Sequence, residues 1–515
     1  MGKIINNISK QLYRQLVRLG YKALTADDQR VFDPYYDAMN GYWSSSVSFP
    51  DLWAWSDASP VFYKPIGDLL CCLQYDGTLG KWGALPFIGR YSVESVGSAL
   101  RVLRCDMETL QLPLYVAFLS EWMLLWYQSV RGVLWEIERP REWMDYVFQR
   151  TDFEQSLNKP DNMYRYRYFL RRFSTETVPL TSASMEECLE CMRTVWCSGK
   201  ECTDCYACPL EAVEKTVSEL DKLRAGGILV RVDGKPAGFC IVSCRNGSGI
   251  YLFKHANNHI KGLNEYLLRE CYLRFMQSAK EINYTNDMGN EGLKAYKSKL
   301  APYSLSAQIM LKAMELKRAT PEEVRLVYER DLVEAFPPME LRTWPEIEDL
   351  MQRNKYEFLC LHDGAEIVGT VSLCPSRPGW TYWEYLCVTP TRRNAGLGKL
   401  LVQAVLERYS DSVIFGEVEA PAHAPDPALA ARRRELYLRN GFFQAGFEVE
   451  LFGVCYNVLY HADAPLPDAD IQREYDALCQ SVYPPDEYER YIRIPYKAQE
   501  IVFEETDSLV VIAVD

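Results

Sequence analysis

Strand-like and helix-like runs alternate in the last third of the chain. A capping box at residues 320–323, with proline in the first helical position, predicts the start of a helix. Four apolar runs predict strands, the first two joined by an Asp-Gly hairpin turn: residues 358–362, 367–374, 381–388 and 413–418. Two further runs predict helices: residues 399–409 and 432–440. Strands that alternate with helices predict a mixed α/β domain.

The same plan of elements occurs once more, upstream. Residues 229–244 and residues 359–374 each consist of a strand, an Asp-Gly turn and a second strand. A tyrosine opens and a glycine closes the next segment in both copies, and these segments, 251–262 and 385–396, have the same length. The repeat predicts a second domain of the same fold in residues 161–316. Chance similarity is the alternative, because turn and strand signals of this kind are common.

A loop with two arginines and two glycines joins a predicted strand to a predicted helix. Its sequence, residues 388–399, is Val-Thr-Pro-Thr-Arg-Arg-Asn-Ala-Gly-Leu-Gly-Lys. Gly396 and Gly398 let backbone N–H groups approach a ligand that a Cβ would hold off, and these groups lie at the positive end of a helix. Arg392 and Arg393 add charge-assisted donors. A diphosphate is the ligand that fits such a loop.

The order Val-x-Pro-x-Arg-Arg-x-x-Gly-x-Gly resembles the acyl-CoA loop of the GNAT family of N-acetyltransferases. The segment 435–443, with a tyrosine on a helix followed by Gly-Phe, resembles a later motif of that family, so the resemblance covers about residues 317–462. It implies that the loop binds the pyrophosphate of acetyl-CoA. The residues expected to bind it are Cys387, Val388, Arg392, Arg393, Asn394, Ala395, Gly396, Leu397, Gly398 and Lys399.

Amine acetylation needs a base that deprotonates the ammonium and an acid that protonates the departing thiolate. The GNAT resemblance places Tyr437 as the acid. Glu384, on the strand that leads into the loop, and Glu417, near the end of the next strand, are the candidate bases, either directly or through water. The alternatives are a tyrosine that only packs its ring and carboxylates that are only solvated.

Four motifs in the first 316 residues resemble an uncharacterised bacterial family related to the C-terminal domain of phosphatidylglycerol lysyltransferases. They are Asp27-Asp-Gln, Ser48-Phe-Pro-Asp-Leu-Trp-Ala-Trp55, Phe253-Lys-His-Ala-Asn-Asn-His-Ile-Lys-Gly-Leu263 and Asn286-Asp-Met-Gly-Asn-Glu-Gly-Leu-Lys294. The resemblance implies a pair of acetyltransferase-like domains, in agreement with the repeat. Relatives that are lysyltransferases move an aminoacyl group from tRNA to a lipid.

The upstream copy departs from the acyl-CoA loop at three positions. Asn264 occupies the place of Gly398, and Asn258-His259 occupies the place of the arginine pair. A Cβ therefore intrudes on the phosphate approach and fixed charge is lost. We expect this copy to bind CoA weakly or not at all.

Composition limits the remaining functions. A chain of 515 residues suggests about three or four domains. A net charge of −13 disfavours a broad nucleic-acid surface, although it does not exclude tRNA. The longest apolar candidate for a membrane span, residues 112–127, is too short and contains Glu121. Seventeen cysteines without a secretory signal predict reduced thiols and a cytoplasmic location.

Six cysteines cluster between residues 188 and 208. The last four, Cys197, Cys202, Cys205 and Cys208, have the ligand count of a tetrahedral zinc site or an iron–sulfur cluster, within a turn-rich segment. The alternative is a segment of reduced, partly buried thiols, because spacing alone does not fix the geometry.

The sequence thus predicts a bacterial α/β (α+β) protein with three acetyltransferase-like mixed-sheet domains. A tandem pair, residues 1–160 and 161–316, precedes a GNAT domain, residues 317–463, and a C-terminal extension of unassigned role, residues 464–515. The expected activity is transfer of an acetyl group from acetyl-CoA to a small-molecule or peptide amine. The alternatives are an aminoacyl transferase that uses charged tRNA and a non-catalytic sensor that binds CoA or a metal.

Overall fold

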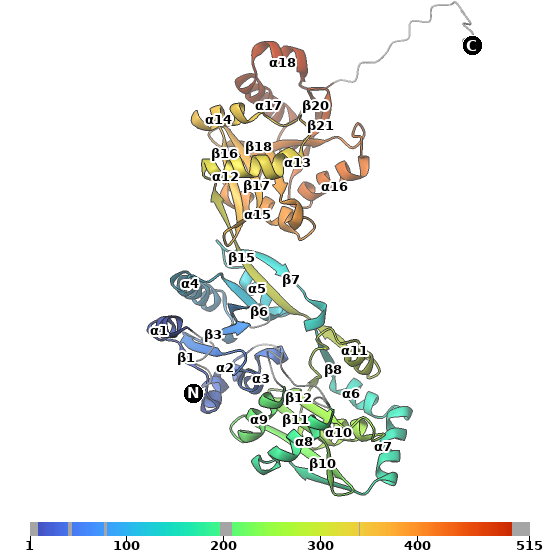
Figure 1. Ribbon diagram of the computed structural model, residues 1–515. Helices are drawn as coiled ribbons and strands as arrows, with labels where there is room; N and C mark the ends of the chain where they lie inside the picture. The colour runs from blue at the N-terminus through green and yellow to red at the C-terminus, as the bar shows by residue number, and fades with distance from the viewer. Residues whose placement is uncertain (1–8, 40–43, 77–79, 196–208, 339, 497–515) are drawn as a thin grey trace, which may run out of the picture. The chain divides into compact units, whose positions relative to one another are not determined.

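The computed structural model describes residues 9–39, 44–76, 80–195, 209–338 and 340–496 (Figure 1). The chain forms two compact units, residues 1–313 and residues 314–515. Both consist of mixed sheets covered by helices, which confirms the predicted α/β class.

The first sheet of the first unit has the strand order β1-β2-β3-β4-β6-β15, and β4 and β6 form its parallel pair. Its strands are β1 (Lys22–Ala23), β2 (Val61–Ile66), β3 (Leu69–Asp76), β4 (Lys81–Ala84), β6 (Tyr115–Ser120) and β15 (Gln308–Arg318), with β5 (Ile88–Gly89) on β3 and β7 (Leu134–Glu138) on β15. The helices of this half are α1 (Lys10–Arg18), α2 (Gln29–Asp37), α3 (Phe49–Ala54), α4 (Val93–Thr109) and α5 (Glu121–Gln128). Leu69 to Leu73 of β3 are all buried, because helices cover both of its faces.

The second sheet of the first unit has the order β14-β8-β13-β12-β11-β10-β9. Its strands are β8 (Asp145–Gln149), β9 (Thr175–Pro179), β10 (Ala225–Val232), β11 (Lys235–Arg245), β12 (Ser248–Ala256), β13 (Glu281–Asn283) and β14 (Ser304–Ser306). The helices are α6 (Arg150–Leu157), α7 (Pro160–Arg172), α8 (Met185–Val195), α9 (Pro209–Ser218), α10 (Leu263–Cys271) and α11 (Glu291–Ser298). The second sheet is inserted into the first along the chain, because all of its strands, β8 to β14, lie between β7 and β15 of the first sheet.

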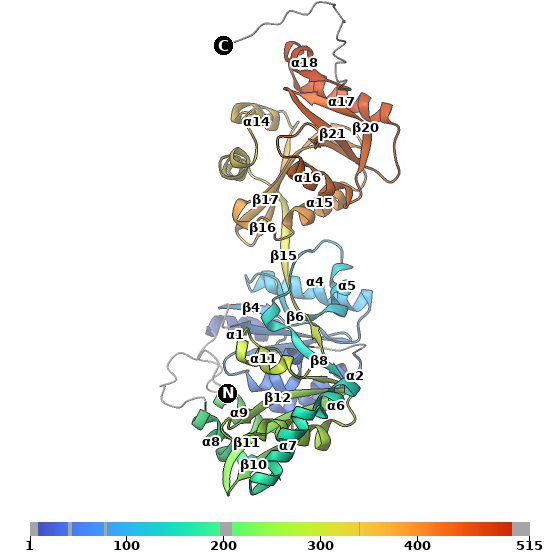
Figure 2. The same cartoon turned by 90° about the vertical axis from the view of Figure 1, so that its right-hand side faces the viewer.

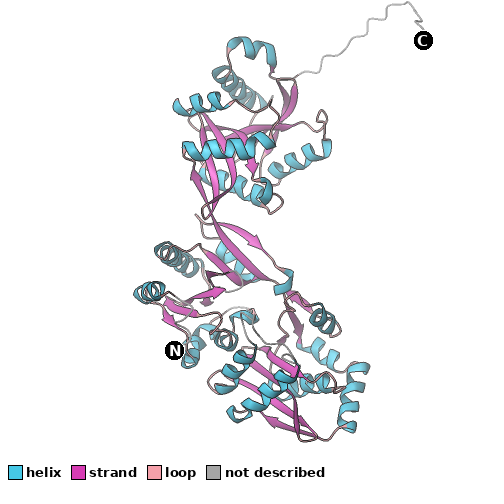
Figure 3. Ribbon diagram, in the orientation of Figure 1, coloured by secondary structure: helices cyan, strands magenta, loops and turns pink. Residues whose placement is uncertain are grey.

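Side chains alternate along β10 and β11, so the second sheet has two buried faces. Helices lie beside the strands of this sheet in the ribbon (Figure 3). Leu229 and Phe239 pack with α8 and α9, whereas Val230 and Cys240 pack with α7 and α10. A helical layer on each side explains why both strands read as nearly continuous apolar runs.

The second unit has one sheet, in the order β16-β17-β18-β19-β21-β20-β22, which the C-terminal part of β15 joins beside β16. Its strands are β16 (Glu357–Asp363), β17 (Glu366–Arg377), β18 (Trp380–Val388), β19 (Val413–Glu419), β20 (Phe443–Leu451), β21 (Val454–His461) and β22 (Ile492–Arg493). The helices are α12 (Pro321–Val327), α13 (Val333–Ala335), α14 (Trp344–Gln352), α15 (Leu397–Arg408), α16 (Pro427–Leu438), α17 (Asp468–Val482) and α18 (Pro485–Tyr491). Helices α15 and α16 cover one face, and α12, α14 and α17 cover the other (Figure 2).

Candidate functional site

The two central parallel strands of the second unit form a fork. Strands β18 and β19 pair as far as Trp383 opposite Gly416 and then separate. A Cβ at position 416 would lie 2.4 Å from the carbonyl oxygen of Trp383, so glycine allows the close approach at the last pair. Glu384 and Glu417 are the first residues beyond this pair, and each lies at the start of one arm.

A cleft of about 1460 Å³ opens at the fork. Its lining brings together the three predicted catalytic residues, Glu384, Glu417 and Tyr437. It also contains eight of the predicted loop residues: Cys387, Val388, Arg393, Asn394, Gly396, Leu397, Gly398 and Lys399. One cavity thus joins the proposed anion loop to the proposed acid and bases.

Two residues of the predicted loop set lie outside the cleft lining. The guanidinium of Arg392 turns away, with Nη1 3.0 Å from a carboxylate oxygen of Asp363 and 3.4 Å from one of Glu366. Ala395 does not contribute to the lining either. The hairpin carboxylates therefore hold Arg392 outside the cleft, whereas Arg393 lines the cleft, where its Nη1 lies 3.4 Å from a carboxylate oxygen of Glu334 and its Nε donates to the Val388 carbonyl at 3.2 Å.

The start of α15 has the geometry of an anion-binding turn. Gly396 is its N-cap, with a left-handed φ of 83° and no side-chain cap. No atom lies within 4 Å of the position that a Cβ at residue 396 would take, so the turn is open. Its backbone N–H groups are therefore free of a capping side chain and available to an anion.

Glu417 has the electrostatics of a general base. Burial raises the pKa of this carboxyl to about 7, while hydrogen bonds from the hydroxyls of Tyr382 and Tyr475 oppose the rise. The Tyr382 hydroxyl donates to a Glu417 oxygen at 2.5 Å. A carboxyl with a pKa near neutrality can accept a proton and release it again at physiological pH.

Glu384 lies in a different environment. Arg342 Nε donates to its carboxylate at 2.8 Å, the Tyr356 hydroxyl contacts its other oxygen, and its side chain is only 8% exposed. Both carboxylate oxygens of Glu384 are therefore engaged by neighbouring side chains. The geometry therefore favours Glu417 over Glu384 as the base.

Tyr437 extends from α16 into the cleft lining and packs its ring on Trp383 and Phe442, at centroid distances of 5.8 Å and 5.4 Å. Burial raises the pKa of Tyr437 well above its usual range. Its hydroxyl is therefore protonated at neutral pH, which is the state that an acid requires.

Sequence reasoning missed the polar side chains that surround the two glutamates. They are Arg342, Tyr356, Tyr382, Tyr475 and Tyr483. Arg342 precedes a helix in an irregular segment, and the last two tyrosines belong to the unassigned extension. No local sequence pattern distinguishes them from ordinary surface or core residues.

The first unit contains a fork of the same kind. Strands β12 and β13 pair in parallel as far as Ile250 opposite Asn283 and then separate. Tyr251 and Tyr284 follow the last pair, with ring centroids 5.0 Å apart, in the places that Glu384 and Glu417 take in the second unit. The chemistry of the two forks therefore differs although the strand geometry agrees.

The anion loop of this upstream copy is covered. Gly262 is the N-cap of α10 with a φ of 91°, as Gly396 is for α15. A Cβ there would lie 2.2 Å from the carbonyl oxygen of Arg165 and 2.9 Å from Cβ of Phe169, both on α7. Helix α7 therefore occupies the space in which a diphosphate would approach the loop.

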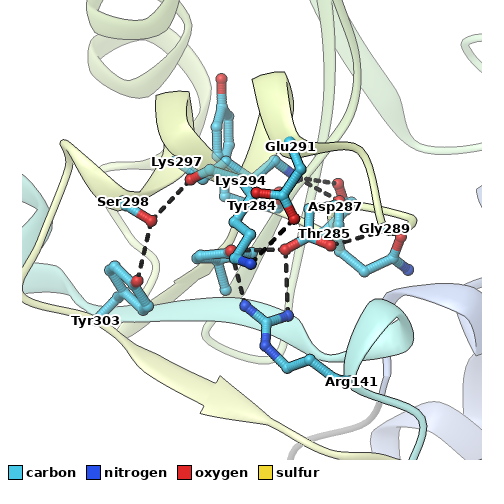
Figure 4. A network of polar contacts seen from close by, with 12 residues as sticks. Arg141, Tyr284, Thr285, Asp287, Gly289, Glu291, Lys294, Lys297, Ser298 and Tyr303 are labelled. Carbon is cyan, nitrogen blue, oxygen red and sulfur yellow. Dashed lines mark hydrogen bonds and ion pairs between the residues drawn. The ribbon is translucent and has the colours of Figure 1, made fainter.

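A buried lysine lies beside this second fork. Lys297, on α11, is 5% exposed, and its Nζ donates to the carbonyl oxygens of Tyr284 and Asn286, both at 2.6 Å (Figure 4). Burial lowers the pKa of this ammonium to about 8, although Asp145 and Asp287 oppose the change. The first part of the motif 286–294 thus forms a loop that a buried lysine holds, and the rest is the start of α11.

The proposed metal ligands Cys197, Cys202, Cys205 and Cys208 lie outside the described residues. Within the described part of the chain, no group of three or more histidine, cysteine or acidic residues has the arrangement of a metal site. Burial raises the pKa of Cys188 and of Cys191 to about 12, so these two thiols are protonated.

Comparison with known proteins agrees with both halves of the sequence analysis. The family described as phosphatidylglycerol lysyltransferase, C-terminal, matches residues 42–311, and the acetyltransferase (GNAT) family matches residues 322–442. No curated protein matches the chain. In the described residues, no helix combines the length and the apolar character that crossing a membrane requires.

Three solved structures are similar to part of this chain. A conserved protein of unknown function from Bacteroides thetaiotaomicron is 19% identical, with a TM-score of 0.52 over 57% of this chain and 99% of that one. L-PGS from Bacillus licheniformis is 12% identical (TM-score 0.34, 63% and 96%). The ribosomal-protein-S18-alanine N-acetyltransferase of Escherichia coli is 14% identical (TM-score 0.23, 30% and 96%).

Two forked sheets and two family matches define an acyltransferase. The chain belongs to the phosphatidylglycerol lysyltransferase C-terminal family, whose match spans more than half of its length, and it carries a GNAT domain after that region.

Proposed function

We propose that the second unit transfers the acetyl group of acetyl-CoA to an amine. The observation that carries the proposal is one cleft that contains both an open anion loop and a carboxyl with a pKa near 7. The N–H groups at the start of α15, with Arg393, receive the diphosphate of the co-substrate. Its thioester then reaches toward the fork.

The chemistry at the fork follows from two side chains. Glu417 takes a proton from the acceptor ammonium, directly or through water, and the free amine attacks the thioester carbonyl. A C–N bond forms, the C–S bond breaks, and the Tyr437 hydroxyl gives its proton to the departing thiolate. The surplus proton on the new amide nitrogen returns to the Tyr437 phenolate, directly or through water, and Glu417 releases its proton to solvent. Glu384 holds the Arg342 guanidinium in place.

Acetyl-CoA binding should depend on one arginine of the pair and not on the other. Arg393→Gln removes a charge that faces the cleft, so its thermal shift with acetyl-CoA should fall well below that of wild type. Arg392→Gln is the matched control, because its guanidinium is held by the hairpin carboxylates. The absence of a shift in wild type at millimolar acetyl-CoA would refute the proposal.

Turnover is tested separately by thiol release from acetyl-CoA with a panel of amines. Tyr437→Phe should lower kcat about 10- to 100-fold and leave the affinity for acetyl-CoA unchanged. Unchanged turnover would remove Tyr437 from the acid role. Binding of acetyl-CoA without turnover on any amine would instead favour a sensor.

A second candidate function concerns the first unit, which we propose to be an aminoacyl transferase that uses charged tRNA. The supporting observation is that α7 covers the loop at Gly262, so CoA is not the expected donor there. The outer face of α7 also exposes Tyr164 and several arginines, and Lys261 Nζ lies 5.2 Å from the Tyr164 ring centroid. Salt-dependent tRNA binding, lost on Arg167→Glu with Arg171→Glu, tests it.

A further inference from the structure

The described part of the C-terminal extension, residues 464–496, is part of the second unit and not a separate appendage. Helix α17 buries Ile471 and Tyr475 in the core of that unit, and β22 pairs with β20 at the sheet edge. Glu474, buried on the same helix, accepts a hydrogen bond from Arg377 Nε at 2.5 Å. These contacts fix the extension against the transferase sheet, although the GNAT match ends at residue 442.

The extension supplies walls to the cleft beyond the fork. A small cavity of about 20 Å³ lies there and shares Arg342, Tyr382 and Glu384 with the large cleft. Four of its lining residues come from the extension: Leu478, Cys479, Val482 and Tyr483. The anion loop does not contribute to this cavity. The small cavity is therefore the end of the cleft that the co-substrate leaves free.

Apolar side chains line this end together with one ion pair and three tyrosines, whose hydroxyls hydrogen-bond to Glu384, Glu417 and Arg342. Leu350, Leu451, Leu478, Val482 and two cysteine thiols line it beside tyrosine rings. The only charges are those of Arg342 and Glu384, which neutralise each other. The space has room for about one water molecule or methyl group, so it suits a small apolar group rather than a second charge.

Contacts on both sides hold the Tyr483 side chain in place in the cavity wall. Its hydroxyl accepts a hydrogen bond from Arg342 Nη2 at 3.3 Å, and the guanidinium carbon of Arg342 lies 5.0 Å from its ring centroid. The ring of Phe452 packs on its other side at 5.6 Å. The aromatic ring is therefore a rigid boundary of the cavity.

We propose that the C-terminal extension is the acceptor-recognition element of the transferase and selects short amines with an apolar body, with Tyr483 as the specificity-determining wall. The inference rests on the proposed function, because it takes the fork as the place of acyl transfer. It assigns a role to residues that lie outside both family matches. Removal of the Tyr483 ring should lengthen the pocket and admit longer amines.

The test uses CoA conjugates in which the sulfur carries a –CH₂–CO–NH–R group made from methylamine, propylamine or hexylamine. Their affinities are measured by calorimetry, which needs no turnover. Wild type should bind the hexyl conjugate about tenfold more weakly than the methyl conjugate, and Tyr483→Ala should remove most of this difference. Tyr483→Phe should keep it, because the ring and not the hydroxyl forms the wall.

Tyr488→Ala is the matched control, because Tyr488 lies on α18 of the same extension, outside the cleft lining, and its hydroxyl donates to Asp476. Val482→Ala provides a second wall variant if Tyr483→Ala fails to fold. An equal length dependence in wild type and both wall variants, with acetyl-CoA affinity intact, would overturn the inference alone. Failure of wild type to bind acetyl-CoA and every conjugate would overturn the proposed function as well.

Discussion

The two helix-starting glycines offer a matched pair of substitutions, Gly262→Ala and Gly396→Ala. Both residues are N-caps with left-handed backbones, at φ of 91° and 83°. An alanine in this conformation costs about 1 kcal/mol at either position. Only at position 262 does the added Cβ also meet fixed backbone, 2.2 Å from the carbonyl oxygen of Arg165.

The structure therefore predicts that the two substitutions lower the unfolding free energy by different amounts. A contact of 2.2 Å forces α7 to move, which adds about 2 kcal/mol. We expect Gly262→Ala to lower the unfolding free energy of the first unit by about 3 kcal/mol and Gly396→Ala to lower that of the second unit by about 1 kcal/mol. With a melting entropy of about 2.1 cal/mol/K per residue, the melting temperature should fall by about 5 °C for the first unit and by about 2 °C for the second unit.

Function should respond in the opposite order. Gly396→Ala places a methyl group in the open turn and should weaken acetyl-CoA binding, whereas Gly262→Ala should leave it unchanged. Hydrogen exchange measured by mass spectrometry follows the stability of each unit separately, and calorimetry gives the affinity. If Gly262→Ala costs no more than Gly396→Ala, α7 does not seal the upstream loop, and the argument that this copy is closed to CoA fails.

Four further predictions concern Glu417, Asp145 and the cysteine cluster. Activity should rise with pH through about 7, because Glu417 acts as a base only when ionised, and Glu417→Gln should abolish this limb of the pH–rate profile and lower kcat about 100-fold. The pKa of Glu417 is about 7 in the folded protein and 4.5 for a free carboxyl, so ionisation of Glu417 destabilises the fold. The free energy of unfolding should therefore decline as pH rises between these two values. Glu417→Gln should reduce this decline in denaturant titrations. Asp145 is fully buried and accepts hydrogen bonds from Ser45, Asn283 and Gln308. Asp145→Ala should therefore lower the unfolding free energy of the first unit by about 3 kcal/mol in urea titrations, while acetyl-CoA binding persists. A decrease of less than about 1 kcal/mol in the unfolding free energy would contradict this role. Elemental analysis of protein purified anaerobically without chelator should find one zinc or one iron–sulfur cluster that Cys205→Ser removes, and freely titrating thiols with no metal would leave only the unliganded interpretation.

Local signals in the sequence were sufficient for most elements of the second unit. Turn chemistry and apolar periodicity predicted the strands around the hairpin to within a few residues. The weaker signal at α16 led to a start at 432 instead of Pro427, because only Ala430 of that helix is fully buried.

The sequence by itself also determined which chemical groups are available. The glycines and arginines of the loop, the tyrosine on α16 and the glutamates on β18 and β19 could be selected because residue type and position beside a strand end restrict their chemistry. Composition and the repeat then indicated two related folds in one chain.

Only the tertiary structure decided how these groups act. Arg392 faces the hairpin carboxylates, and Glu384 is neutralised by Arg342, a partner chosen across 42 residues. Helix α7 closes the loop at Gly262, and Tyr483 of the extension reaches the transferase cleft. Charge balance, burial and access depend on side chains that the fold brings together from distant segments, and a local pattern contains no information about those neighbours.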